Sequence, residues 1–348
     1  MSVGDYQANP WKFPMAAMLQ KHSKCNTIGN SRTYALSTLR AYVEAHPDEF
    51  LMPTGFIYHE TRTGSTLVAN MLAHVPTNLV MSEHSIAENP IRGCANCSPS
   101  QTSELLQLLL RLLATAKDGH TNAFFKFSDA TGIHSMSLAF PDVPWVYLFR
   151  DPVDVMVSNL KGAYGKRTRL YEGFDFEGKN ATAIENKKPG TASKFFLSPC
   201  LNGGRLLKLR KEEHKEITCA SWLKKLCESV LTQLSAERGE GADESGGVKG
   251  AVVEYTNLPD VVTNFIYPDH FGMGQELLEA HMPYLSKAAS MYSKSMANPE
   301  SKFEMGTDAN YKQIMAEDAY RKAAESTGLM ALYKQLQELQ TWKKQAHS

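Results

Sequence analysis

The sequence predicts an α/β protein in which a central, mainly parallel sheet lies between two layers of helices, as a three-layer α/β/α fold. Short apolar segments alternate along the chain with segments of helical spacing, the pattern of strands joined by crossover helices. Two apolar runs pass directly into a loop and then a helix, at residues 56–72 and 144–158. Unbroken apolar runs of this kind are typical of parallel strands covered on both faces.

The elements follow from the same patterns in chain order. Strands are expected at residues 55–58, 77–81, 123–127, 144–149 and 251–255, where short apolar runs are bounded by turn residues. Helices are expected where apolar residues recur at helical spacing, at residues 31–46, 65–74, 102–116, 206–234, 261–271 and 320–342.

The domain organisation follows from shifts in composition. Residues 1–50 are expected to be a helical N-terminal extension, and residues 51–348 a single domain that is helical from 274 onward. Residues 161–211 carry 12 lysines and arginines against four acidic residues, which indicates either a solvated loop or a lid over a phosphate-rich ligand. Residues 237–250 are rich in glycine and acidic residues, so a flexible loop is expected there.

The composition limits the classes of partner. The chain has 348 residues, 43% hydrophobic and 21% charged, and its formal net charge of +0 provides no field that would attract nucleic acid. No apolar run approaches the roughly 20 residues of a membrane span, and residues 1–10 lack the apolar core of a secretory signal. We therefore expect a cytoplasmic protein with no membrane span. Only Cys94 and Cys97 of the six cysteines are closely spaced, so we expect structural or incidental thiols in a reducing environment.

The loop after the first strand is expected to bind an anion. Gly64 permits an unusual backbone conformation, and the following helix directs its free N–H groups and positive dipole end at the loop. In the common nucleotide-binding pattern G-x-x-x-x-G-K-[ST], the first glycine is replaced by His59 and the lysine by Ser65. The positive charge is instead inside the loop, at Arg62. The loop therefore lacks the point charge that the γ-phosphate of ATP requires.

The second strand-loop-helix unit places an arginine at the end of its strand. Arg150 follows the apolar run, Asp151 is positioned to cap the next helix, and Pro152 suits its first position. In open α/β sheets, ligands bind at the carboxyl ends of the strands. Ser158 follows Arg150 by eight residues. A buried salt bridge could explain Arg150 alone, but not its pairing with an upstream anion loop.

The first loop resembles the 5′-phosphosulfate loop of the sulfotransferases, which use 3′-phosphoadenosine-5′-phosphosulfate (PAPS). That loop has Lys or Arg, then Ser or Thr, Gly, Ser or Thr, and Thr. The matching residues here are Arg62, Thr63, Gly64, Ser65 and Thr66. The resemblance implies that these five residues bind PAPS.

The second motif resembles the same family. The sulfotransferases have an arginine and a serine at the spacing of Arg150 and Ser158, which together hold the 3′-phosphate of PAPS. The resemblance covers roughly residues 54–272. It implies a sulfotransferase fold, which is similar to that of the P-loop NTPases.

The activity implied is transfer of a sulfuryl group from PAPS to a hydroxyl acceptor without a metal ion. Arg62 and the N–H groups of residues 63–66 would stabilise charge on the bridging oxygen. A small alcohol, sterol, phenol or sugar acceptor stays open, as does the oligomeric state. Two rivals are a P-loop phosphotransferase that uses a nucleotide, against which Ser65 counts, and a non-catalytic nucleotide-binding relative. Retention of both anion motifs counts against the second rival.

The sequence also departs from the cytosolic sulfotransferases. Many of them have a Lys-Thr-His run with a catalytic histidine where this chain has Lys126-Phe127-Ser128. Their Arg-Lys-Gly run near the C-terminus has no counterpart, and nothing distinguishes Lys302 or Lys312 as a substitute. The chain therefore resembles the divergent sulfotransferases more closely.

The general base must lie near the loop, within hydrogen-bond reach of the acceptor. The candidates are Glu60, His59, Glu83, His84, Asp129 and His134. We predict Glu83, which follows a second strand expected to lie beside the first, as in some bacterial sulfotransferases. Partial burial is expected to raise the pKa of Glu83 toward neutrality. Asp129, close to the position of the missing histidine, is second, and Glu83 could instead cap the next helix.

Overall fold

A five-stranded parallel sheet is the centre of the computed structural model. Its order is β2 (Asn78–Ser82), β3 (Asn122–Phe127), β1 (Pro53–His59), β4 (Trp145–Phe149) and β5 (Gly250–Glu254), and every neighbouring pair is parallel. The structure describes residues 3–12, 16, 20, 32–84, 86–88, 96–115, 119–128, 130–165, 200, 215–239, 248–291, 318–340 and 342.

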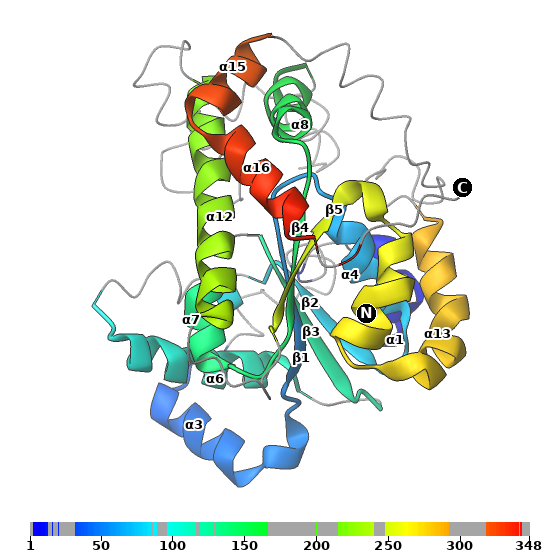
Figure 1. Ribbon diagram of the computed structural model, residues 1–348. Helices are drawn as coiled ribbons and strands as arrows, with labels where there is room; N and C mark the ends of the chain where they lie inside the picture. The colour runs from blue at the N-terminus through cyan, green and yellow to red at the C-terminus, as the bar shows by residue number, and fades with distance from the viewer. Residues whose placement is uncertain are drawn as a thin grey trace, which may run out of the picture. The chain divides into compact units, whose positions relative to one another are not determined.

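Helices cover both faces of the sheet, so the predicted α/β architecture with three layers is confirmed (Figure 1). On one face, α4 (Ser65–His74), the π-helix η6 (Val262–His270) and α13 (Gly274–Ala289) join a continuous apolar core. The other face is aromatic and lies toward α6 (Pro99–Leu113) and α7 (Ile133–Ala139). Its rings contact one another at centroid distances of 5.2 to 6.4 Å, among them Phe56, Tyr58, Phe125, Phe127, Phe140 and Trp145.

The chain divides into two compact units. The first contains the sheet and consists of Met1–Phe149, Ser229–Glu304 and Leu339–Ser348. The second consists of Arg150–Glu228 and Met305–Glu338. Its helices are α8 (Pro152–Gly165), the first part of α12 (Lys215–Arg238), α15 (Asp318–Ser326) and α16 (Leu329–Glu338).

The strand order differs from the expectation that the second strand lies beside the first. β3 separates β2 from β1. All residues of β3 from Ala123 to Phe127 are buried, including three phenylalanines, which suits a position inside the sheet. Neighbours in sequence are neighbours in a sheet only about two-thirds of the time. Adjacency in the chain was therefore a weak guide to adjacency in the sheet.

Several predicted boundaries are also corrected. α6 begins at Pro99 rather than 102, because Ser98 and Gln101 form a capping box with bonds of 3.2 and 2.9 Å. The two ends of the predicted flexible loop at 237–250 are regular structure, since α12 continues to Arg238 and β5 begins at Gly250, and residues 240–247 lie outside the described residues. The helix predicted at 320–342 is divided into α15 and α16 at Gly328, whose φ of 78° is left-handed.

Short helices and 3₁₀ turns occur among the described residues of the N-terminal segment 1–50. The segment contains α1 (Val3–Ala8), the 3₁₀ turn η1 (Pro10–Lys12), α3 (Leu36–Ala45) and the 3₁₀ turn η3 (Pro47–Glu49). The first five residues of the basic segment 161–211 belong to α8, and its remainder, apart from Cys200, lies outside the described residues. In the part of the chain that is described, no helix combines the length and apolar character that a membrane crossing requires.

The cysteines differ from the expectation of free thiols. Cys200 forms a disulfide with Cys219 in the second unit, and Cys97 is also disulfide-bonded. Cys227 is a buried free thiol. Disulfides persist mainly in oxidising compartments, so this pairing does not fit the reducing environment that the spacing of the cysteines led us to expect.

Candidate functional site

The loop between β1 and α4 is fixed to the sheet through Glu60. The Glu60 N–H donates to the carbonyl of Leu148 in β4 at 3.2 Å, and the hydroxyl of Tyr147 donates to Oε1 of Glu60 at 3.3 Å. The Thr63 hydroxyl donates to the Glu60 carbonyl at 3.0 Å. Both Glu60 and Thr63 are buried. Because its side chain is held by Tyr147 inside the protein, Glu60 shapes the loop rather than presenting a base.

The loop turns into α4 through two left-handed residues. Arg62 has a φ of 68° and Gly64 a φ of 78°. The Gly64 carbonyl accepts the first bonds of the helix at 2.8 and 3.3 Å. The N–H groups of Ser65 and Thr66 precede these bonds, so they have no partner within the helix. Free N–H groups at the positive end of a helix dipole are the feature with which helix N-termini bind anions, so the geometry of the loop is compatible with the predicted anion site.

The segment after β5 packs directly against this glycine. A Cβ atom at Gly64 would lie 2.5 Å from Cδ1 of Leu258 and 3.1 Å from the ring of Tyr255, the first residue of the 3₁₀ turn η5 (Tyr255–Asn257). Real Cβ atoms essentially never approach another atom to 2.5 Å, and a separation of 3.1 Å is tighter than most Cβ contacts. Only glycine satisfies both the backbone angle and the close approach of Leu258.

A buried lysine stands beside the loop and was given no role in the sequence analysis. Lys126 lies in β3 with a fully buried side chain, and its ammonium group contacts the carboxylate of Glu83. The same ammonium lies 3.5 Å from the hydroxyl oxygens of Thr66 and Ser82. β3 thus brings a cation to the helix of the loop, which lacks the usual lysine at Ser65.

His59, the last residue of β1, lies against the same carboxylate. Its Nδ1 lies 2.6 Å from the Glu60 carbonyl, which can only accept, so Nδ1 carries a proton. Its Nε2 lies 3.5 Å from Oε1 of Glu83 and makes no hydrogen bond with the described residues. Lys126 and His59 therefore converge on one oxygen of Glu83.

Glu83 is held in a strained position at the end of β2. Its φ is 53°, and its N–H donates to the Lys126 carbonyl at 2.8 Å. Oε1 faces Lys126 and His59, whereas Oε2 has no hydrogen bond to any described residue. The side chain is 20% exposed. Among the described residues, one carboxylate oxygen of Glu83 is thus held by Lys126 and faces His59, and the other has no hydrogen-bond partner.

The pKa of Glu83 is shifted in the direction opposite to our expectation. Burial alone would raise the pKa, but the Lys126 ammonium and, to a smaller degree, His59 outweigh burial and hold it well below its usual range. Burial lowers the pKa of His59, Glu83 opposes that change, and Lys126 adds to it. At neutral pH, Glu83 is therefore a carboxylate and His59 is neutral.

Glu83 does not cap the turn that follows it. The Ile86 N–H donates instead to Nδ1 of His84 at 3.2 Å, and Nε2 of His84 lies 2.7 Å from the Gln20 amide. His84 is therefore the capping residue, which removes the alternative explanation of Glu83. The exposed His134 belongs to α7 and lies 3.2 Å from Oε1 of Gln233.

A second carboxylate at this edge was not identified in the sequence analysis. Oε1 of the buried Glu88 accepts from both the N–H and the hydroxyl of Ser128, at 2.7 and 2.8 Å. It thus ties the segment after β2 to the end of β3. No local pattern in the sequence marks Glu88, because its partner Ser128 lies 40 residues away in the chain. The other predicted carboxylate, Asp129, lies outside the described residues, so its assignment remains a prediction.

The second motif lies in the second unit. Asp151 caps α8 as predicted, accepting from the N–H groups of Val153 and Asp154 at 2.9 and 3.1 Å. Arg150 donates from Nε and Nη2 to one oxygen of Asp154 at 3.0 and 2.6 Å. Ser158, half-buried, is one turn beyond Asp154 on the same face of the helix. The buried salt bridge is therefore present, and a phosphate would share Arg150 with Asp154.

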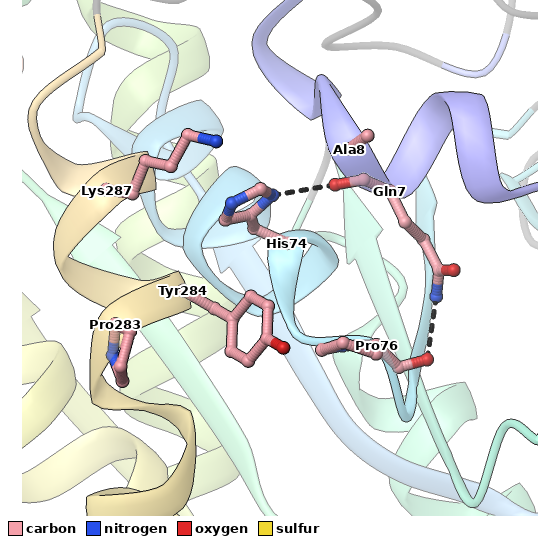
Figure 2. Close-up of a pocket in the computed structure, with 7 residues that line it drawn as sticks. All are labelled: Gln7, Ala8, His74, Pro76, Pro283, Tyr284 and Lys287. Carbon is pink, nitrogen blue, oxygen red and sulfur yellow. Dashed lines mark hydrogen bonds between the residues drawn. The ribbon is translucent and has the colours of Figure 1, made fainter.

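A separate surface hollow lies at the other end of α4. It has a volume of about 430 Å³ and is lined by Gln7, Ala8, His74, Pro76, Pro283, Tyr284 and Lys287 (Figure 2). His74 ends α4, and its Nδ1 donates to the Gln7 carbonyl at 2.7 Å. Ten helical residues span about 15 Å, so this hollow does not join the loop site.

Comparison with known proteins does not assign the chain to a family. No protein-family model matches it, and no curated protein sequence matches it significantly. The described residues contain no group of three or more His, Cys, Asp or Glu side chains arranged to hold a metal ion. The features of the described residues that bear on function are therefore the loop and the cluster of Lys126, Glu83 and His59.

Proposed function

We propose that the protein is a sulfotransferase that moves a sulfuryl group from PAPS to a hydroxyl of a small acceptor. The observation that carries the proposal is the buried Lys126, whose ammonium lies 3.5 Å from the Thr66 hydroxyl beside the anion loop. It adds a second cation to Arg62 at the place where a sulfuryl group would bind. Preorganised donors and cations of this kind stabilise charge that develops on a leaving oxygen.

The reaction requires an attack, a departure and a proton transfer. The acceptor oxygen forms a bond to sulfur, and the bond from sulfur to the bridging phosphate oxygen breaks. 3′-Phosphoadenosine-5′-phosphate leaves with the electron pair, next to the loop N–H groups, Arg62 and Lys126. The acceptor hydroxyl gives its proton to Glu83, whose free oxygen Oε2 makes it the base in this proposal.

Phosphoryl transfer from ATP is the main rival. Two features of the loop count against it: Ser65 replaces the usual lysine, and His59 replaces the usual first glycine. These features favour a sulfuryl donor. The acceptor class proposed from the family resemblance is a small alcohol, sterol, phenol or sugar.

The compartment is also a proposal. The sequence favoured the cytoplasm, but the Cys200–Cys219 disulfide favours an oxidising compartment, which is the compartment that we propose. Mass spectrometry of unreduced peptides from the native source should detect the linked pair. Recovery of both cysteines as free thiols would return the proposal to the cytoplasm.

Radiolabelled PAPS, incubated with the protein and a metabolite extract, tests the activity. We expect a labelled product, and a Glu83→Gln variant should lose transfer by roughly 10²-fold or more while still binding the nucleotide. Glu104→Gln is the matched control, because Glu104 forms only an exposed ion pair with Arg40 at 3.2 Å. Label transferred from ATP but not from PAPS would support the phosphotransferase. Nucleotide binding without any transfer would support the non-catalytic relative.

A further inference from the structure

His59 lies beside the proposed base Glu83 but has no role in the reaction described above. It is the last residue of β1, its side chain is 6% exposed, and it lies next to the loop. Donation from Nδ1 to the Glu60 carbonyl at 2.6 Å fixes the tautomer of the neutral ring. Nε2 is then the unprotonated nitrogen, and it faces Oε1 of Glu83 at 3.5 Å. Two electron-rich atoms thus face each other, and a single proton would join them.

We propose that His59 is the proton relay behind Glu83, taking from its carboxyl group the proton that Glu83 receives from the acceptor hydroxyl. This inference rests on the proposed sulfuryl transfer. The acceptor O–H bond breaks as the proton binds Oε2. Rotation of the carboxyl group then exchanges its two oxygens and presents the acid proton to Nε2. Glu83 returns to a carboxylate, and the buried imidazolium holds the proton until the product leaves, when the proton passes back through the partly exposed Glu83 to solvent.

The electrostatics of the cluster explain why a relay is needed. The ammonium of Lys126 stabilises the Glu83 carboxylate, so Glu83 holds a proton poorly. Imidazole ordinarily binds a proton about two pH units more tightly than a glutamate carboxylate. Among the described residues, the titratable groups that act on His59 are Glu83, which favours its protonation, and Lys126, which opposes it. Glu60 acts through its backbone carbonyl. His59 is therefore a positioning and relay residue, and Glu83 remains the group that touches the acceptor.

The variant His59→Asn tests the relay, because the asparagine amide can keep the N–H bond to the Glu60 carbonyl but removes Nε2. We expect transfer to fall at least about 10-fold, with unchanged nucleotide affinity, and the acidic limb of the pH–rate profile to move or disappear. His46→Asn is the matched control, because Nδ1 of the exposed His46 donates to the Tyr42 carbonyl at 2.9 Å. That variant should keep the wild-type profile.

A second measurement does not depend on His59→Asn folding. Nitrogen-15 NMR of the His59 ring in wild type and in Glu83→Gln follows its protonation directly. Loss of the carboxylate should lower the pKa of His59 further, because Glu83 favours the imidazolium. An unchanged titration of His59, or an active His59→Asn variant with the wild-type pH profile, overturns the relay alone. A folded wild-type protein that transfers nothing from PAPS overturns the proposed function and the relay with it.

Discussion

Replacing Lys126 with methionine should destabilise the protein strongly and in a pH-dependent manner. Methionine keeps the length of the side chain and removes its charge, which leaves the Glu83 carboxylate without its main counter-charge. Removing one partner of a buried ion pair costs about 3–5 kcal/mol. Because the Glu83 side chain is 20% exposed, water can solvate part of its charge. We therefore expect the lower end of that range, about 3 kcal/mol.

The pH dependence has a defined sign. In the wild type, the folded pKa of Glu83 lies below its unfolded value of about 4.3, so the pair contributes stability above that pH and loses it as the pH falls through the folded pKa. In Lys126→Met, the main group that lowers the pKa of Glu83 is gone, so burial raises the pKa of Glu83 in the folded state above its value in the unfolded state. The stability penalty of the variant should then be largest near neutrality and shrink as the pH falls toward about 4.3.

Urea denaturation of both proteins at pH 7.5 and pH 5 measures this effect. Lys224→Met is the matched control, since Lys224 forms an exposed pair with Glu228 at 3.5 Å and should cost no more than about 0.5 kcal/mol. The double variant Lys126→Met with Glu83→Gln removes both charges. Its free energy of unfolding should be at least about 1 kcal/mol higher than that of Lys126→Met alone. A Lys126→Met penalty equal to that of Lys224→Met, or one that does not shrink on acidification, would refute the reasoning.

Three further predictions concern the two motifs and the absence of a metal requirement. Gly64→Ala should destabilise the protein by about 1–3 kcal/mol more than Gly119→Ala, as measured by thermal unfolding. Both glycines have a left-handed φ, but only a Cβ at Gly64 would collide with Leu258, so equal losses of stability would contradict this prediction. Arg150→Ala should weaken binding of 3′-phosphoadenosine-5′-phosphate by about 1.5–3 kcal/mol in calorimetry, whereas the control Asp154→Asn should not weaken it. If Arg150→Ala weakens binding of ADP by the same amount, Arg150 does not contact the 3′-phosphate. Transfer activity should survive excess EDTA; restoration by Mg²⁺ after a loss would favour the phosphotransferase.

Local patterns in the sequence predicted the elements of the fold well. Each strand appeared as a short apolar run with turn residues at its ends, and α4 was predicted with the bounds that the structure gives. The loop could be interpreted because Gly64 and the start of the helix determine each other locally. The missed start of α6 had a readable signal in Ser98 and Gln101, which form the capping box.

The cluster around Lys126 could not be predicted in the same way. It is formed by the ends of three strands, and its geometry depends on the strand order, in which β3 lies between β2 and β1. The pKa of Glu83 was predicted with the wrong sign because only its burial was considered. Its cationic partner lies 43 residues away in the chain. Contacts of this range depend on how the strands pair, which apolar patterns alone do not specify.

Isothermal titration calorimetry with 3′-phosphoadenosine-5′-phosphate, ADP and ATP, each with and without Mg²⁺, tests the central claim most directly. The 3′-phosphorylated nucleotide should bind at least about tenfold more tightly than ADP, a difference of about 1.4 kcal/mol, with no dependence on Mg²⁺. Equal affinities for the 3′-phosphorylated and unphosphorylated nucleotides, or tighter binding of ATP in the presence of Mg²⁺, would contradict the assignment as a PAPS-dependent sulfotransferase.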